Sequence, residues 1–77
     1  MTKYRIDIRR KHGLADPEGA TTARALHDLG YSGVVDVSFG RVIFVDTDDG
    51  DASDVAAMCE QLLANPVIEE YAIEVVE

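Results

Sequence analysis

The segment from Met58 to Val75 constrains the fold most, because it combines a helical pattern, a helix stop and a strand pattern. The helical pattern begins just upstream, and its apolar residues follow the i, i+3, i+4, i+7, i+8 spacing of one helix face: Val55, Met58, Cys59, Leu62 and Leu63. Asn65 readily adopts the left-handed conformation that ends a helix, and Pro66 lacks the N–H needed to continue it. Residues 71–76 then follow the two-residue alternation of a strand.

Two helices and a first strand are predicted from similar local signals. Residues 4–10 alternate between apolar and charged side chains, which predicts a half-buried strand. Residues 16–30 predict a helix with an aspartate cap, a proline at its first position and a glycine at its end. The second helix is expected to begin at a cap, Asp51 or Ser53, and to end near residue 64.

A hairpin is predicted between the two helices. Val34–Phe39 and Val42–Val45 are β-rich runs, and a two-residue loop with glycine first, Gly40-Arg41, is typical of a type II′ turn. In that register the face predicted to be the core carries Val35, Val37, Phe39, Val42 and Phe44. The other face carries Val34, Asp36, Ser38, Ile43 and Val45.

The order of elements predicts a single domain over residues 1–77 with a duplicated βαβ arrangement. We expect an α+β, ferredoxin-like two-layer sandwich (βαββαβ), in which a four-stranded antiparallel sheet of order 4-1-3-2 carries both helices on one face. The first and last strands are then neighbours, and Arg5 and Arg9 are placed to pair with Glu74 across the outer face.

The opposite sheet face is left bare in this arrangement. It is expected to carry an apolar patch of the kind that marks an interface, made of Val34, Ile43, Val45, Ala72 and Val76. A chain of 77 residues with one cysteine also has a small core and no disulfide to support it. We therefore expect a homo-oligomer that forms through the open face or the strand edges.

The charge balance limits the classes of partner. Seven basic against fifteen acidic residues give a net charge of −8, which repels nucleic acid and anionic membranes. No apolar run approaches a membrane span, and the first residues enter a strand pattern without a signal core. We expect a cytoplasmic protein. The acidic surface also motivates the hypothesis of a salt-adapted source.

No catalytic, cofactor or metal site is predicted. The acidic loop 46–54 lacks the EF-hand spacing, because Gly50 takes a ligand position and Ala57 stands where the bidentate carboxylate belongs. Cys59 lies on the apolar helix stripe and is interpreted as a core thiol rather than a nucleophile. The two histidines have no nucleophile motif beside them and are interpreted as surface residues.

The basic loop after the first strand has two open interpretations. Lys11, His12 and the helix start at Asp16 together suit an anion or a partner carboxylate. The alternative is a solvated loop tip.

The amino-acid sequence resembles that of the PurS family, whose members are the small subunit of phosphoribosylformylglycinamidine (FGAM) synthase. The strongest resemblance is the run 58–71 followed by 73–75. The helix start at 16–19, the helix end at 29–31 and the dipeptide Gly40-Arg41 also match the family in the right order.

The resemblance implies a non-catalytic bridging subunit of an ATP-dependent, glutamine-using C–N ligase in purine biosynthesis. Its partners are then a glutaminase subunit and a large synthetase subunit, between which it assists ammonia transfer, with ATP and Mg in the synthetase subunit. It also implies a homodimer, with a tetramer as a larger assembly. The alternative is an ACT-like small-molecule-binding regulator of the same fold. Plausible partner contacts are Leu14, Asp16, Pro17, Gly19, Asn65, Pro66, Val67, Ile68, Glu69 and Tyr71.

Overall fold

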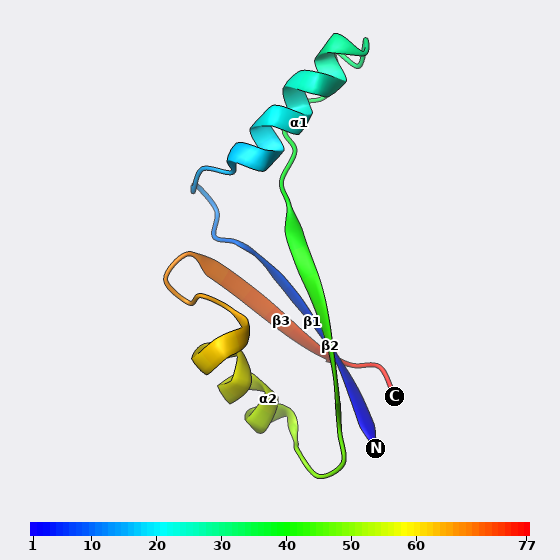
Figure 1. Cartoon of the computed structure of the whole chain (residues 1–77), viewed down its shortest axis with the longest axis vertical. Coiled ribbons are helices and arrows are strands. Elements are labelled where there is room, and N and C mark those ends of the chain that lie inside the picture. The colour runs from blue at the N-terminus through cyan, green and yellow to red at the C-terminus, as the bar shows by residue number, and fades with distance from the viewer.

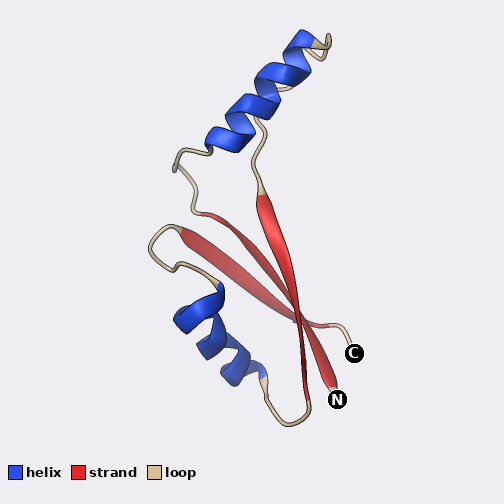
Figure 2. Ribbon diagram, in the orientation of Figure 1, coloured by secondary structure: helices blue, strands red, loops and turns tan.

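The computed structural model covers residues 1–77 and contains three strands and two helical segments (Figures 1 and 2). In chain order the elements are β1 (Thr2–Arg10), α1 (Pro17–Asp28), β2 (Gly40–Thr47), α2 (Ala52–Met58), the π-helical turn η1 (Cys59–Leu63) and β3 (Glu69–Val75). Neither helical segment has the length and apolar character that crossing a membrane requires.

The sheet is antiparallel, and its order is β2-β1-β3. Tyr4 of β1 lies opposite Val45 of β2 and opposite Val75 of β3. The prediction that the first and last strands are neighbours is therefore confirmed. The prediction that the strand after Gly40 pairs with the other edge of β1 is confirmed as well.

The predicted fourth strand and hairpin are wrong. Residues 34–39 belong to no strand, and Gly40-Arg41 is not a turn but the start of β2. A type II′ turn needs a positive φ at its first central residue, and the only glycines with positive φ are Gly13 and Gly30. Gly40 instead lies within the pairing of β2 with β1, where its lack of a side chain allows close approach of the two strands. A Cβ on it would lie 2.7 Å from the carbonyl oxygen of Ile8.

The core side of the sheet is the opposite of the predicted one. Ile43 and Val45 pack against the buried cluster, whereas Val42 and Phe44 are exposed on the open face. The cause is the register, which places Ile43 opposite Ile6, and a one-residue slip exchanges the faces of a whole strand. The buried cluster consists of Tyr4, Ile6, Ile8, Val55, Cys59 and Ala64.

Only α2 covers the sheet, which contradicts the prediction of two helices on one face. Helix α1 stands away from it and runs alongside the returning segment 29–39 (Figure 1). We call α1 and residues 29–39 the arm. The radius of gyration is 15.9 Å, against about 11.5 Å for a compact chain of this length, and the extents are 50 × 26 × 14 Å. The molecule is therefore elongated, with seven buried residues.

Both predicted helix starts are confirmed. Asp16 caps α1 by accepting a hydrogen bond from the Gly19 N–H at 2.9 Å, and Gly30 follows α1 with a φ of +105°. Asp51 caps α2 and forms a reciprocal capping box with Asp54.

The end of the second helical segment differs from the prediction. No non-glycine residue has a positive φ, so Asn65 does not adopt a left-handed conformation. The helix widens into η1 instead and closes with a hydrogen bond from the Ala64 N–H to the Cys59 carbonyl at 3.0 Å. The wider turn directs Ala64 toward the core, while Leu62 is 83% exposed rather than part of the buried stripe.

The outer face of the sheet carries charge as well as apolar groups. Arg5 lies opposite Glu74 as predicted, but its guanidinium pairs with Asp7 of its own strand at 3.2 Å. Val42 and Ala72 are both opposite Asp7 and therefore share this face, whereas the predicted patch residues Ile43 and Val45 do not.

Candidate functional site

Six of the ten predicted contact residues lie in two turns that meet at one end of the sheet, and the other four flank these turns: Pro17, Gly19, Glu69 and Tyr71. The first is the hinge, residues 11–16, which leads from β1 into α1. The second is the corner, residues 64–68, which leads from η1 into β3. The N–H of Lys11 donates to the carbonyl of Ile68 at 2.9 Å, so the two turns are joined directly.

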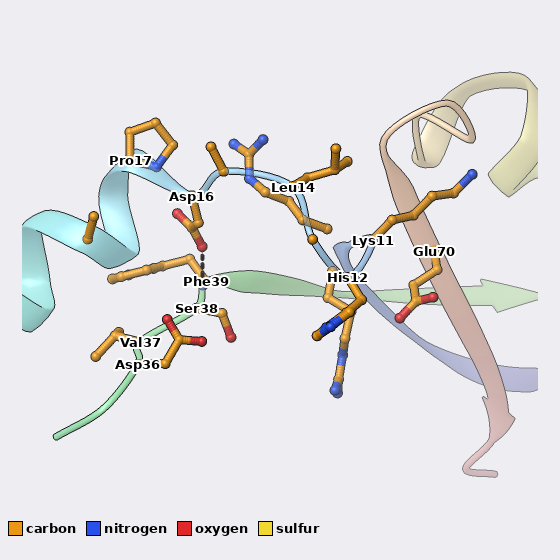
Figure 3. A pocket seen from close by; sticks show the side chains of 15 residues that line it. Lys11, His12, Leu14, Asp16, Pro17, Asp36, Val37, Ser38, Phe39 and Glu70 are labelled. Atoms are coloured by element: carbon orange, nitrogen blue, oxygen red, sulfur yellow. Dashed lines mark hydrogen bonds between the residues drawn. The ribbon is translucent and has the colours of Figure 1, made fainter.

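The hinge borders a hollow of about 570 Å³ between the sheet and the arm (Figure 3). Three of the predicted contact residues line it: Leu14, Asp16 and Pro17. The rest of the lining comes from the end of β1, from the other hinge residues, from Ala20 of α1, from residues 36–39 of the arm and from Glu70 of β3. The hollow therefore joins three segments that are far apart in the sequence.

Asp16 ties the base of the arm together. One carboxylate oxygen accepts from the Gly19 N–H at 2.9 Å, and the other accepts from the Phe39 N–H at 2.7 Å (Figure 3). These bonds, the one from Phe39 first, hold the pKa of the Asp16 carboxyl below its ordinary value. The side chain is thus an ionised structural link between the two ends of the arm.

The corner is held by an ion pair that spans two strands. The Arg41 guanidinium contacts the Glu69 carboxylate in two places, at 2.7 and 3.1 Å, and also donates to the Leu63 carbonyl at 2.8 Å. The Asn65 N–H donates to the same carboxylate at 2.8 Å. The pKa of Glu69 is lowered, first by Arg41 and then by the Asn65 N–H, and the pKa of Arg41 is raised by Glu69.

The other predicted contact residues have varied surroundings. The Asn65 side chain accepts a hydrogen bond from the Val67 N–H at 3.1 Å, and Val67 is 78% exposed. Gly19 is buried, and a Cβ there would overlap the Val37 carbonyl oxygen. Tyr71 packs beside the core, and the Glu60 carboxylate raises its pKa. Only part of the predicted set is therefore available at the surface.

The groups weighed for chemistry lie apart from each other. Cys59 is fully buried, and burial followed by the charge of Glu60 raises the pKa of its thiol. His27 contacts the Val34 carbonyl oxygen through Nε2 at 2.7 Å and so belongs to the arm. No three His, Cys, Asp or Glu side chains are grouped where they would hold a metal ion. These groups therefore do not form a nucleophile–base pair or a metal-binding cluster.

Three residues of this region were missed from the sequence. Arg41 was assigned to a turn, although an arginine that follows a glycine in a β-rich run is equally compatible with the start of a strand. Phe39 was assigned to the core, yet it is 40% exposed in the hollow. Arg10 ends the first strand as predicted, but its place in the lining of the same hollow was not foreseen.

Comparison with known proteins identifies relatives over nearly the whole chain. A family model described as PurS, phosphoribosylformylglycinamidine (FGAM) synthase, matches residues 3–77. The PurS subunit of this synthase from Archaeoglobus fulgidus is 44% identical over 72 residues, covering 88% of this chain and 90% of the relative. The subunit from Bacillus subtilis is 39% identical over 80 residues, covering 100% and 95%.

Solved structures agree in fold. Methanocaldococcus jannaschii PurS, described as one of the subunits of formylglycinamide ribonucleotide amidotransferase in the purine biosynthetic pathway, superposes with a TM-score of 0.87. It is 38% identical, and the match covers 100% of this chain and 98% of that one. A chain in the structure of PurLQS from Thermotoga maritima has a TM-score of 0.83 and 29% identity, with 97% and 96% covered.

Proposed function

Because this chain belongs to the PurS family of FGAM synthase subunits, we propose that it is the bridging subunit of such a complex in purine biosynthesis. It joins a glutaminase subunit to an ATP-dependent synthetase subunit in the cytoplasm and assists the transfer of ammonia between them. The observation that carries the bridging role is the arm, which stands off the sheet without a core of its own. A segment of this kind is stabilised by contacts with other chains.

The chemistry of the complex is assigned to the partners. Release of ammonia from glutamine needs an activated nucleophile, and the only cysteine here is buried with a raised pKa. Activation of the substrate by ATP needs a phosphate cradle and carboxylates that hold Mg, and we assign both to the synthetase subunit. This chain contributes surfaces that contact the other subunits.

The same subunit is proposed to form a homodimer through the free edge of β2. Residues 34–39 belong to no strand, and they continue directly into β2, whose outer edge has no neighbour. A second copy that places its own residues 34–39 on this edge completes a four-stranded ferredoxin-like sheet. Its order is β3-β1-β2 followed by the strand of the second copy, which corresponds to the predicted order 4-1-3-2. The exchange satisfies backbone groups that one chain leaves open, and it is reciprocal, as a two-fold interface requires.

The apolar side chains of this region support the dimer. Val35 is 96% exposed in the single chain, and Phe44 is 59% exposed. Large apolar side chains that are this exposed are often found at interfaces. A tetramer is the larger assembly that follows if the open faces of two such dimers also pair.

The decisive experiment is an omission assay. Glutamine-dependent FGAM synthesis is measured with the purified glutaminase and synthetase subunits, with and without this chain, and ammonia-dependent synthesis is the control. We expect glutamine-dependent synthesis to require the chain and ammonia-dependent synthesis to depend on it less. Equal glutamine-dependent rates with and without the chain would refute the bridging role and favour the ACT-like regulator.

A further inference from the structure

One segment of the arm has an open backbone. No N–H or C=O group of residues 35–38 makes a hydrogen bond within the chain. At one end of this segment, His27 contacts the Val34 carbonyl oxygen at 2.7 Å. At the other end, the Phe39 N–H donates to the Asp16 carboxylate at 2.7 Å. The segment then continues into β2, whose outer edge is also free (Figure 1). Both features suit it to pairing with a strand edge of another chain.

The alternation of side chains relates this segment to the observed faces of β2. Ile43 and Val45 pack against the buried cluster, whereas Val42 and Phe44 lie on the open face. The segment before β2 has apolar side chains at its odd-numbered positions and two polar ones at even-numbered positions: Val35, Val37 and Phe39 against Asp36 and Ser38. Because side chains alternate between the faces of a sheet, a strand without a turn from residue 35 to residue 45 places these apolar side chains on the core face.

A hairpin within one chain has the opposite outcome. A two-residue turn at residues 40–41 sets Phe39 opposite Val42, and opposite residues share a face. The apolar side chains of the segment then lie on the open face, while Asp36 and Ser38 turn toward the core. Burying the Asp36 carboxylate there without a partner is costly. A second copy avoids this cost, because no turn fixes the register of its pairing.

The two-fold axis of a dimer restricts the register further. Odd-numbered residues lie opposite odd-numbered residues only when the axis passes through a pair of identical residues, one from each copy. With Gly40 opposite the partner's Gly40, all of residues 34–39 pair with residues 41–46 of the second copy. Val35 then lies opposite the partner's Val45.

The neighbouring registers are less favourable. With the axis at Arg41, the two arginines lie opposite each other, and Asp36 lies opposite the partner's Asp46. Like charges in directly opposite positions are destabilising. With the axis at Phe39, Val45 has no partner within residues 34–39. The register centred on Gly40 pairs the whole segment without a like-charge pair.

We propose that two copies of this chain pair in the register centred on Gly40. Val35 of each copy lies opposite the partner's Val45 on the core face, and Val37 lies opposite the partner's Ile43 in the same way. This inference rests on the dimer of the proposed function and names the side chains that meet in it. It gives a core-face position to Val35, which is 96% exposed in the single chain.

Paired cysteines test the register in a Cys59→Ala background, which removes the native thiol. Ser38→Cys combined with Val42→Cys places two thiols opposite each other on the open face, where Cα atoms about 4.5–5.5 Å apart allow a disulfide. We expect oxidised glutathione to double the apparent mass on a non-reducing gel, whereas each single-cysteine variant keeps the mass of one chain. Asp36→Cys combined with Phe44→Cys is a second pair in the same register. Circular dichroism checks that each variant is folded.

Three results would overturn the register. A disulfide between chains from Ser38→Cys with Phe44→Cys, but not with Val42→Cys, would place the axis at Arg41. A disulfide within one chain from Phe39→Cys with Val42→Cys would show the closed hairpin. A dimer in sedimentation that no cysteine pair links would place the contact elsewhere. A wild-type chain that sediments as a monomer would refute the proposed dimer itself, while the omission assay tests the bridging role separately.

Discussion

Replacing Glu69 with glutamine tests whether the corner is held by charge. The substitution keeps the shape of the side chain but removes the ion pair with Arg41 and weakens the bond from the Asn65 N–H. The Glu69 side chain is 14% exposed, whereas that of Arg41 is 49% exposed, so water screens one partner strongly. We therefore expect a loss of about 1–2 kcal/mol, between the values for exposed pairs and for shielded charge-assisted bonds.

The assay is thermal unfolding followed by circular dichroism at fixed protein concentration. A loss of about 1.5 kcal/mol corresponds to a fall in Tm of roughly 6–12 °C for a domain of this size. Glu74→Gln is the matched control, because Glu74 lies on the same strand, is exposed and makes no ion pair. A Tm for Glu69→Gln that equals that of the control would refute the argument.

The same ion pair predicts a dependence on pH. The pKa of Glu69 is lowered in the folded chain from an ordinary value of 4.5, so its stabilisation is fully present above pH 4.5. Below that pH the unfolded chain takes up a proton first, and the stabilisation is lost as pH falls through the folded pKa. The difference in unfolding free energy between wild type and Glu69→Gln should therefore shrink between neutral and acid pH. A constant difference would contradict the assigned cause.

Three further predictions concern the arm and the surface charge. Gly19→Ala should lower the Tm despite the better helix propensity of alanine, since its Cβ would overlap the Val37 carbonyl oxygen; Gly33→Ala, with open space around it, should not. Val35→Asp should shift the sedimentation equilibrium toward monomer, whereas Val67→Asp, similarly exposed at the corner, should leave it unchanged. The Tm of the wild type should rise from low to molar salt because its net charge of −8 is then screened. An unchanged Tm for Gly19→Ala, a Val35→Asp variant that associates like wild type, or a flat salt profile would refute these predictions in turn.

Local signals predicted most elements of the fold. The caps at Asp16 and Asp51, the glycine at residue 30 and the alternation of β1 are short-range features, and all four are confirmed. The helix end was predicted less well, because the choice between an asparagine stop and a widened turn depends on a distant group. Arg41 supplies that group when it binds the Leu63 carbonyl.

The candidate site was predicted only in part for the same reason. The basic run and the two contact segments are visible in the sequence, but nothing local indicates that the hinge and the corner meet. Their meeting follows from the register of β1 and β3, which sets Arg10 opposite Glu69. Register is decided by the buried faces of whole strands.

The missing hairpin has a different physical cause. Backbone hydrogen bonds join two strands in the same way whether both strands come from one chain or from two. A pattern of residues that favours the pairing of two strands therefore does not specify which chain provides each strand. The straight passage through Gly40 decides this for the single chain, since it sends residues 34–39 away from their own sheet. Under the proposed dimer, the strand pattern of the sequence describes the sheet of the dimer rather than that of one chain. The exposed apolar side chains of the arm are then the ones that the second copy covers.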